Sequence, residues 1–181
     1  MPRVRVHVLP EHFDEGEVAF IRRVLASGRG YGAVLDVRVD AERRHAYRDG
    51  THVLMLKLPA ERIRRMYPEQ TGVHGLSFTH MASEPRVIVI NADNWRAPPP
   101  AGFTLGIEAY RTYLLNHEVG HALGLHEHQR RTADYCPLMY QQTRGTAGCR
   151  TIDLYPTRAQ QRAVLAHVRE RKRRRLRTPR P

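Results

Sequence analysis

The sequence predicts a single domain of the α+β class. Its 181 residues are enough for one ordinary hydrophobic core and too few for two. Strand-like segments are concentrated in the first half of the chain, whereas a long helix, an irregular segment and a closing helix fill the second half. Strands and helices that are grouped in this way, rather than alternating, are typical of the α+β class.

Four segments in the first half have the composition of β-strands. They are residues 4–8, 33–40, 51–59 and 86–93. The first alternates between apolar and polar side chains, as an edge strand does, and the last is a more continuous apolar run that predicts a buried strand.

Two helices are expected among these strands. Residues 14–30 begin with acidic side chains, place Val18, Ile21 and Leu25 on one face, and reach glycine after the end, which together indicate a helix. Residues 59–77 predict a shorter helix followed by a turn.

The proline-rich stretch at residues 97–102 is expected to interrupt regular structure. A helix is predicted after it over residues 105–123, then irregular chain over residues 124–155, and a last helix over residues 156–175.

Positive charge is concentrated at the end of the chain. The net charge is +12, and only Lys57 and Lys172 among the 30 basic residues are lysines, a skew that a GC-rich genome produces without selection for charge. Residues 169–180 carry eight basic side chains against one acid. We therefore divide the chain into a single domain over residues 1–168 and a basic tail over residues 169–181. The tail is either a solvated helix end or localisation signal, or a contact for nucleic acid or another polyanion.

No apolar run approaches the length that spans a bilayer, and the first residues lack the apolar stretch of a secretion signal. The sequence thus predicts no membrane contact and, by default, a cytoplasmic location.

Cys136 and Cys149 stand thirteen positions apart in a turn-rich stretch. They either form a disulfide or, in a reducing cytosol, stay as free thiols.

The chemistry-bearing motif is His-Glu-x-x-His at residues 117–121. On a helix, His117 and His121 lie one turn apart on the same face, so both imidazoles can bind one Zn²⁺. Glu118 can then act as general base on a water bound to that zinc. Gly124 follows where the helix should end, and its freedom to adopt positive φ lets the chain turn back toward the metal.

With "HEVGHALG", the residues that follow Gly124, and the methionine of "PLMY", the chain resembles the metzincin zinc peptidases. The zinc helix looks like that of matrixins, "HEHQR" is similar to astacins, and the stretch over residues 86–155 is most similar to an uncharacterised actinobacterial family of predicted zinc-protease-like domains. The resemblance implies a zincin fold with a twisted sheet, an active-site helix and a C-terminal helix. It also implies His117 and His121 as zinc ligands, Glu118 as the base and Met139 as the methionine of the Met-turn.

The third zinc ligand is left open between three neighbours. By strict count from Gly124 the family's third histidine falls on Glu127, a carboxylate that can bind zinc. His128 would reach the metal with a one-residue bulge, and His126 with a loop one residue tighter. If two of the three bound together, the site would be closed and non-catalytic.

Further expectations follow for the surroundings of the site. Tyr140 either stabilises an oxyanion or only packs, and the strand over residues 86–91 would border the cleft and offer its edge to a peptide. The scattered histidines are expected to be surface or core residues: His7, His12, His45, His52, His74, His80 and His167.

Two functions are therefore expected from the sequence. The first is a zinc metallopeptidase that hydrolyses protein or peptide substrates with Glu118 as base. The alternative is a non-catalytic zinc scaffold that binds nucleic acid through its arginine-rich tail.

Overall fold

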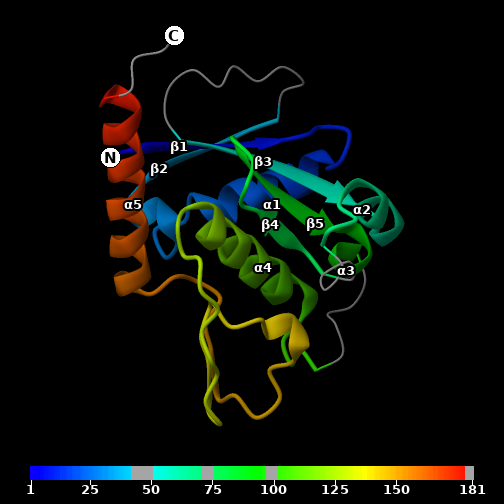
Figure 1. Ribbon diagram of the computed structural model, residues 1–181. Helices are drawn as coiled ribbons and strands as arrows, with labels where there is room; N and C mark the ends of the chain where they lie inside the picture. Colours follow the sequence, from blue (N-terminus) through cyan, green and yellow to red (C-terminus); the bar gives the residue numbers. More distant parts are fainter. Residues whose placement is uncertain (42–50, 71–75, 97–101, 178–181) are drawn as a thin grey trace.

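The computed structural model describes residues 1–41, 51–70, 76–96 and 102–177 (Figure 1). Expectations for His45, His74, most of the proline-rich stretch and residues 178–181 lie outside these ranges. Within them the chain combines a sheet with helices, so the α+β class is confirmed.

A five-stranded sheet has the strand order β2-β1-β3-β5-β4. Four strands are parallel and overlap the predicted segments: β1 (Arg3–Val8), β2 (Asp36–Asp40), β3 (Thr51–Leu58) and β5 (Arg86–Asn91). The edge character expected of the first segment is wrong, because β1 pairs with both β2 and β3. The fifth strand, β4 (Phe78–His80), is antiparallel to β5 and was not predicted.

The expectation that residues 86–91 offer a free edge is wrong. β5 is paired on both sides, with β3 and with β4, so its backbone groups are already used. The edge strand on this side is β4, which pairs with β5 through Phe78↔Val89 and His80↔Val87. A peptide that adds to the sheet here would have to pair with β4.

The main core lies between the sheet and the two helices α1 (Glu15–Leu25) and α4 (Ile107–Ala122) (Figure 1). Val6, Met55 and Ile88 of the strands meet Ile21 of α1 and Leu115 of α4 in one buried cluster. At about 25 cal/mol per Å² of apolar surface, such burial is the main force that holds α4 against the sheet.

The opposite face of the sheet is covered partly by α2 (Ala60–Met66). Its buried Ile63 packs with Leu58, Phe78 and Val89 in a second, smaller cluster. Along β4 the side chains alternate, so Phe78 faces this cluster while Thr79 faces α4.

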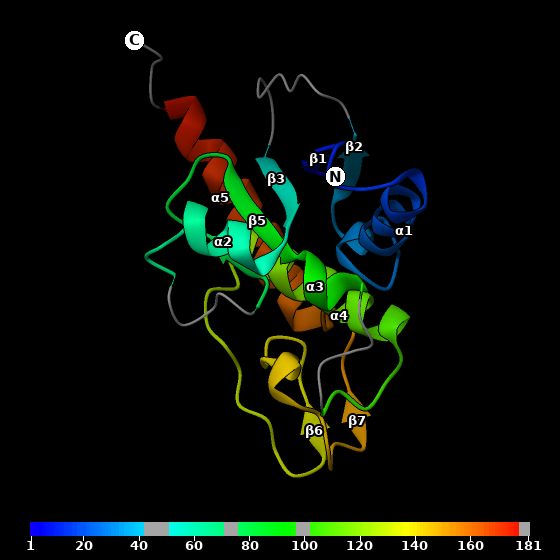
Figure 2. The ribbon, with the colours of Figure 1, turned by 90° about the vertical axis from the view of Figure 1, so that its right-hand side faces the viewer.

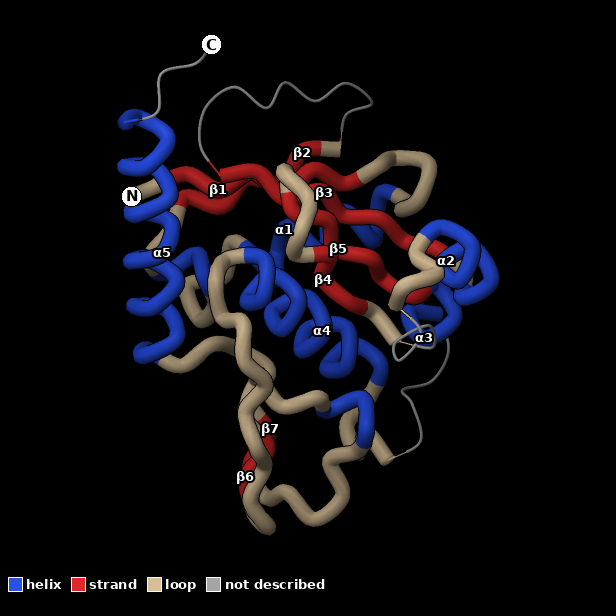
Figure 3. Tube along the Cα trace, viewed as in Figure 1, coloured by secondary structure: helices blue, strands red, loops and turns tan. Residues whose placement is uncertain are grey.

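The chain below α4 has little regular structure (Figure 3). It holds the short pair β6 (Tyr135–Cys136) and β7 (Thr151–Ile152) and a 3₁₀ turn at Gln142–Arg144. α4 therefore runs between the sheet above and this irregular region below it. The short helix α3 (Ala92–Arg96) follows β5 directly (Figure 2).

The last helix, α5 (Arg158–Arg177), is one continuous element that includes the first part of the predicted tail. Val164 and Val168 join the main core, and Arg171 forms an ion pair with Glu84. The basic segment is thus anchored at its start and helical up to Arg177. Among the described residues, no helix is long and apolar enough to cross a membrane.

Candidate metal centre

Helix α4 carries the His-Glu-x-x-His motif through the interior. Its residues are buried on every side from Thr112 to Ala122, because the sheet covers one side and the irregular region covers the other. His117 and Glu118 are each only 3% exposed and His121 is 9% exposed. Arg86 of β5 donates to the carbonyl oxygens of His121 and Ala122, which fixes the end of the helix.

Backbone carbonyls fix the orientation of the two helical imidazoles. Nδ1 of His117 lies 2.8 Å from the carbonyl oxygen of Leu138, and Nδ1 of His121 lies 2.6 Å from that of Leu125. A carbonyl oxygen can only accept, so each Nδ1 carries the hydrogen and each neutral ring has a bare lone pair on Nε2. Such an arrangement is the usual support of a metal-binding histidine.

His128 completes a cluster with these two rings. Nε2 of His121 lies 3.2 Å from Nε2 of His117 and 3.1 Å from Nε2 of His128. One nitrogen from each of the three residues lies within 4.8 Å of the others. His128 itself is exposed, so the cluster is open to solvent on that side.

The donor set fits zinc. Burial lowers the pKa of His117 to about 3 and that of His121 to about 4, and the neighbouring imidazoles act in the same direction. The facing Nε2 atoms of His117 and His121 then both present lone pairs, which repel each other unless a cation lies between them. Nitrogens bound to one tetrahedral zinc at about 2.0–2.1 Å lie roughly 3.3 Å apart, close to the separations found here.

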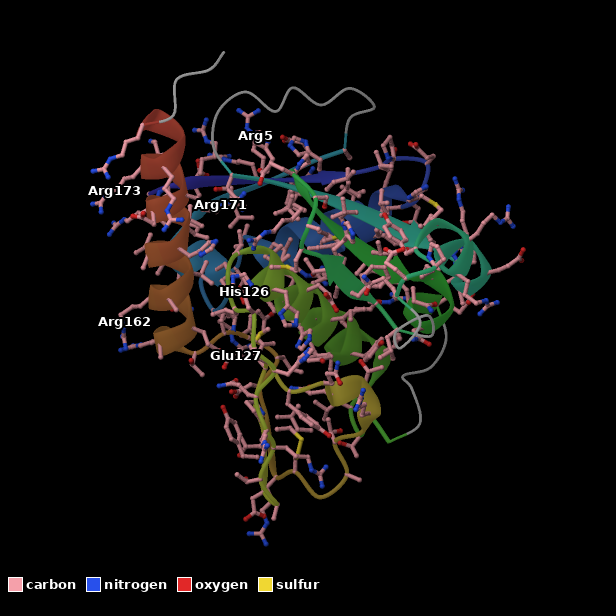
Figure 4. All side chains as sticks on the ribbon, in the orientation of Figure 1. Arg5, His126, Glu127, Arg162, Arg171 and Arg173 are labelled. Carbon is pink, nitrogen blue, oxygen red and sulfur yellow. A yellow bond between two sulfur atoms is a disulfide. The ribbon has the colours of Figure 1, made fainter. Side chains whose placement is uncertain are left out.

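The other two candidates for the third ligand lie outside this cluster. The ring of His126 packs against that of His167 on α5, with 5.8 Å between centroids, although His126 still lines the cavity beside the cluster. Glu127 is exposed on the same loop (Figure 4). The loop after Gly124 therefore has the one extra residue that brings His128, rather than Glu127 or His126, to the cluster.

Glu118 lies beside the histidines in the same cavity. Burial raises the pKa of its carboxyl to about 7, and a hydrogen bond from Thr79 acts in the opposite direction. The hydroxyl of Thr79 lies 2.7 Å from Oε2 of Glu118 and 2.9 Å from its carbonyl oxygen. A carboxyl that can both lose and regain a proton near neutral pH is suited to general acid–base chemistry.

The cavity of about 220 Å³ lies between β4 and the irregular region. The histidines and Glu118 form its floor, and its walls come from two separate segments of the chain. The lining residues that the sequence did not single out are Leu76, Ser77, Phe78, Thr79, Met81, Tyr113, Gln141 and Thr143. No signal in the sequence indicated this wall, because a strand of three residues is too short for its alternation to be recognised.

Tyr140 is not part of the cavity wall, so the oxyanion role is not supported. Its carbonyl oxygen accepts a hydrogen bond from the hydroxyl of Tyr113, whose ring packs 5.2 Å from that of His117. Tyr113 is thus the tyrosine beside the cluster. Its hydroxyl is occupied by the backbone of Tyr140 and Gln142, which makes it a structural partner of this region.

The segment below the cluster is held by several contacts. Cys136 and Cys149 form a disulfide, and between them lie Leu138, which accepts from His117, and the buried Met139. Met139 packs under Gly120, where an added Cβ would lie 3.1 Å from Sδ of the methionine and 2.6 Å from the hydroxyl of Tyr31. Glycine is therefore required at position 120 of α4.

The fold and the site together define an α+β protein with a three-histidine cluster, to which the buried helix α4 contributes His117 and His121 and the loop after it contributes His128. The family described as "Protein of unknown function (DUF3152)" matches residues 63–165, which is more than half of the chain. The chain belongs to this family, and the matched region includes the whole cluster. No curated protein matches the sequence.

Proposed function

We propose that the protein is a zinc-dependent peptidase with a zincin fold of metzincin type. The observation that carries this proposal is the convergence of three imidazole Nε2 atoms next to a buried carboxyl group in one cavity. His117, His121 and His128 would hold the ion through three imidazole nitrogens. Three protein ligands are typical of catalytic zinc, whereas structural zinc has four.

A zinc ion at this position would supply Lewis acidity, which polarises a carbonyl group and makes a water more acidic. Glu118 would take a proton from the attacking water as its oxygen bonds to the carbonyl carbon. The same carboxyl group would then give that proton to the leaving amine as the peptide C–N bond breaks. A peptide that adds as a strand to β4 would lie along the cavity wall, because Phe78 and Thr79 line it.

The deciding experiment compares the wild type with Glu118→Gln. The purified proteins are loaded with zinc, the metal is quantified, and cleavage of casein and of a peptide library is followed by mass spectrometry. We expect cleavage by the wild type and a loss of at least about 100-fold in Glu118→Gln with one zinc retained, since only the base is removed. Glu127→Gln makes the same chemical change on the exposed loop and should keep full activity.

A zinc-loaded wild type that cleaves neither casein nor any peptide would contradict the proposal. Equal losses in Glu118→Gln and Glu127→Gln would contradict the role of Glu118, since the two variants differ only in position.

A second candidate function is the binding of nucleic acid, and the charge on α5 favours it. Arg162 and Arg173 project from the helix away from the sheet, whereas Arg171 lies on the inner side (Figure 4). Beyond the ion pair of Arg171 with Glu84, the exposed end carries Lys172, Arg173, Arg174 and Arg177. Arg174 also pairs with Glu170, and a cluster of exposed cations of this kind fits the phosphates of a nucleic acid backbone.

Removal of residues 172–181 tests this function and leaves the anchored part of α5 in place. We expect the affinity for duplex DNA to fall and its dependence on salt to flatten by about one unit of log–log slope for each lost phosphate contact. An unchanged slope would contradict a contact through α5.

A further inference from the structure

The carboxyl group of Glu118 has one hydrogen-bond partner among the described residues, and that partner is Thr79. The threonine hydroxyl lies 2.7 Å from Oε2 and 2.9 Å from the backbone oxygen of Glu118 itself. The single hydroxyl hydrogen is shared between two oxygens of one residue, so the contact links the glutamate side chain to its own backbone. Oε1 is left without a described partner, in a residue that lines the cavity.

The backbone that carries Thr79 is itself well fixed. Thr79 is the middle residue of β4 and is paired with Ile88 of the buried strand β5. Phe78, its neighbour, is packed on the other face of the sheet against Leu58 and Val89. The hydroxyl therefore approaches α4 from a rigid support, which is the condition for holding a reacting group in one orientation.

The location of Thr79 on the edge strand has a consequence for a bound substrate. A peptide that pairs with β4 would take its register from the same strand that holds Glu118. The distance between the peptide bond to be cleaved and the carboxyl group of Glu118 would then depend on β4 alone. Geometry set in this way affects the rate of the chemical step more than the affinity for the peptide.

We infer that Thr79 is a positioning residue, which holds Oε2 of Glu118 and thereby directs Oε1 toward the reacting groups. This inference rests on the proposed peptidase function. The hydrogen bonds of Thr79 go to Glu118, and the cluster of possible metal ligands consists of the three histidines, so its role is separate from metal binding.

The test uses Thr79→Val, which keeps the shape of the side chain and removes the hydroxyl, and Thr79→Ser, which keeps the hydroxyl. Thr112→Val is the matched control, because Thr112 on α4 also donates to a backbone carbonyl, that of Glu108, and is buried. For each zinc-loaded protein we would measure zinc content, kcat and KM on one cleaved peptide, and the crystal structure around Glu118.

We expect kcat of Thr79→Val to fall by about 10- to 100-fold while KM changes by less than about twofold, since the orientation of the base is lost and the strand remains. Thr79→Ser should stay within about threefold of the wild type, and Thr112→Val should have wild-type kcat. Zinc content should be the same in all four proteins, and the Glu118 carboxyl group should be displaced in the structure of Thr79→Val alone.

Wild-type kcat in Thr79→Val would overturn the inference, and so would equal losses in Thr79→Val and Thr79→Ser. If the wild type binds zinc but cleaves no peptide, the peptidase function fails, and the crystal structures then decide the positioning role. A Glu118 carboxyl group in the same place in Thr79→Val and in the wild type would overturn it in either case.

Discussion

The Nε2 atoms of His121 and His128 lie 3.1 Å apart although seven positions separate the two residues. Gly124 makes this approach possible, because its φ of +111° reverses the chain directly after α4. The amide of Leu125 donates back to the carbonyl of Gly120, and the carbonyl of Leu125 accepts from Nδ1 of His121. The turn that brings His128 to the cluster therefore also orients His121.

This geometry predicts that His128 is the third zinc ligand. His128→Ala should weaken zinc binding by at least about 100-fold, because a three-nitrogen site becomes a two-nitrogen site. His126→Ala and Glu127→Gln should bind zinc within about threefold of the wild type, since neither side chain belongs to the cluster. Competition with a chromophoric chelator measures all three affinities.

The variants His126→Ala and His128→Ala serve as controls for each other. If His126→Ala lost zinc and His128→Ala retained it, the loop would have to be one residue tighter than it is in this structure. Loss of zinc binding in both variants would indicate that His126 and His128 both bind the ion, which closes the site.

A side chain at position 124 should destabilise the fold. An added Cβ would lie 2.5 Å from Cγ of His167, and positive φ strains any residue with a side chain. We expect Gly124→Ala to lower the free energy of unfolding by about 1–3 kcal/mol. This corresponds to a decrease in Tm of roughly 2–12 °C for a chain of this size, measured by calorimetry.

Two further variants separate the causes of this effect. Gly28→Ala should change the unfolding free energy by less than about 0.5 kcal/mol, since nothing lies within 4 Å of an added Cβ. Gly124→Ala combined with His167→Ala removes the steric clash and should be less destabilised than the two single variants predict together. Strict additivity of the two single variants would contradict a direct clash.

The disulfide between Cys136 and Cys149 should stabilise the fold in solution. It closes a loop across thirteen positions, and a loop of this length stabilises by about 3 kcal/mol in the chain-entropy model. Reduction should therefore lower Tm by roughly 6–12 °C. Calorimetry with and without reductant measures the effect, and Cys136→Ser with Cys149→Ser should reproduce it.

The double serine variant also makes the comparison specific, because added reductant should not change its Tm.

Alkylation of thiols in intact cells then tests the cellular compartment of the protein. Disulfides persist in oxidising surroundings, so we expect the native protein to be protected from alkylation. Full labelling of both thiols would favour the cytoplasmic location that the sequence predicts by default.

The sequence predicted those elements that local signals specify. The capping box of Asp14 and Glu17 at the start of α1, and the apolar runs of β3 and β5, depend on residues close together in the chain. The positions of His117 and His121 on one face of α4 follow in the same way from helical geometry. Each of these features depends on residues whose separation along the chain is no more than about one or two helical turns.

The features that the sequence did not predict depend on contacts between distant segments. β4 has only three residues and exists through its pairing with β5, so residues 86–91 were wrongly expected to offer an edge. The partner of Glu118 is Thr79, which lies 39 positions away. The choice of His128 depends on how the loop after Gly124 closes in space, which counting along the chain does not show.

Lys57 should be sensitive to substitution, because its ion pair is largely buried. Its ammonium lies 2.5 Å from Oε2 of Glu17, and the same carboxylate accepts from Nε1 of Trp95. Lys57→Met should lower the unfolding free energy by about 3–5 kcal/mol, because it leaves a largely buried carboxylate without its counter-charge. Arg65→Met breaks an ion pair in which both side chains are at least 75% exposed and should cost less than about 0.5 kcal/mol. Urea unfolding of the two variants measures the difference. Equal midpoints would contradict a larger contribution of the buried Lys57 pair to the free energy of unfolding.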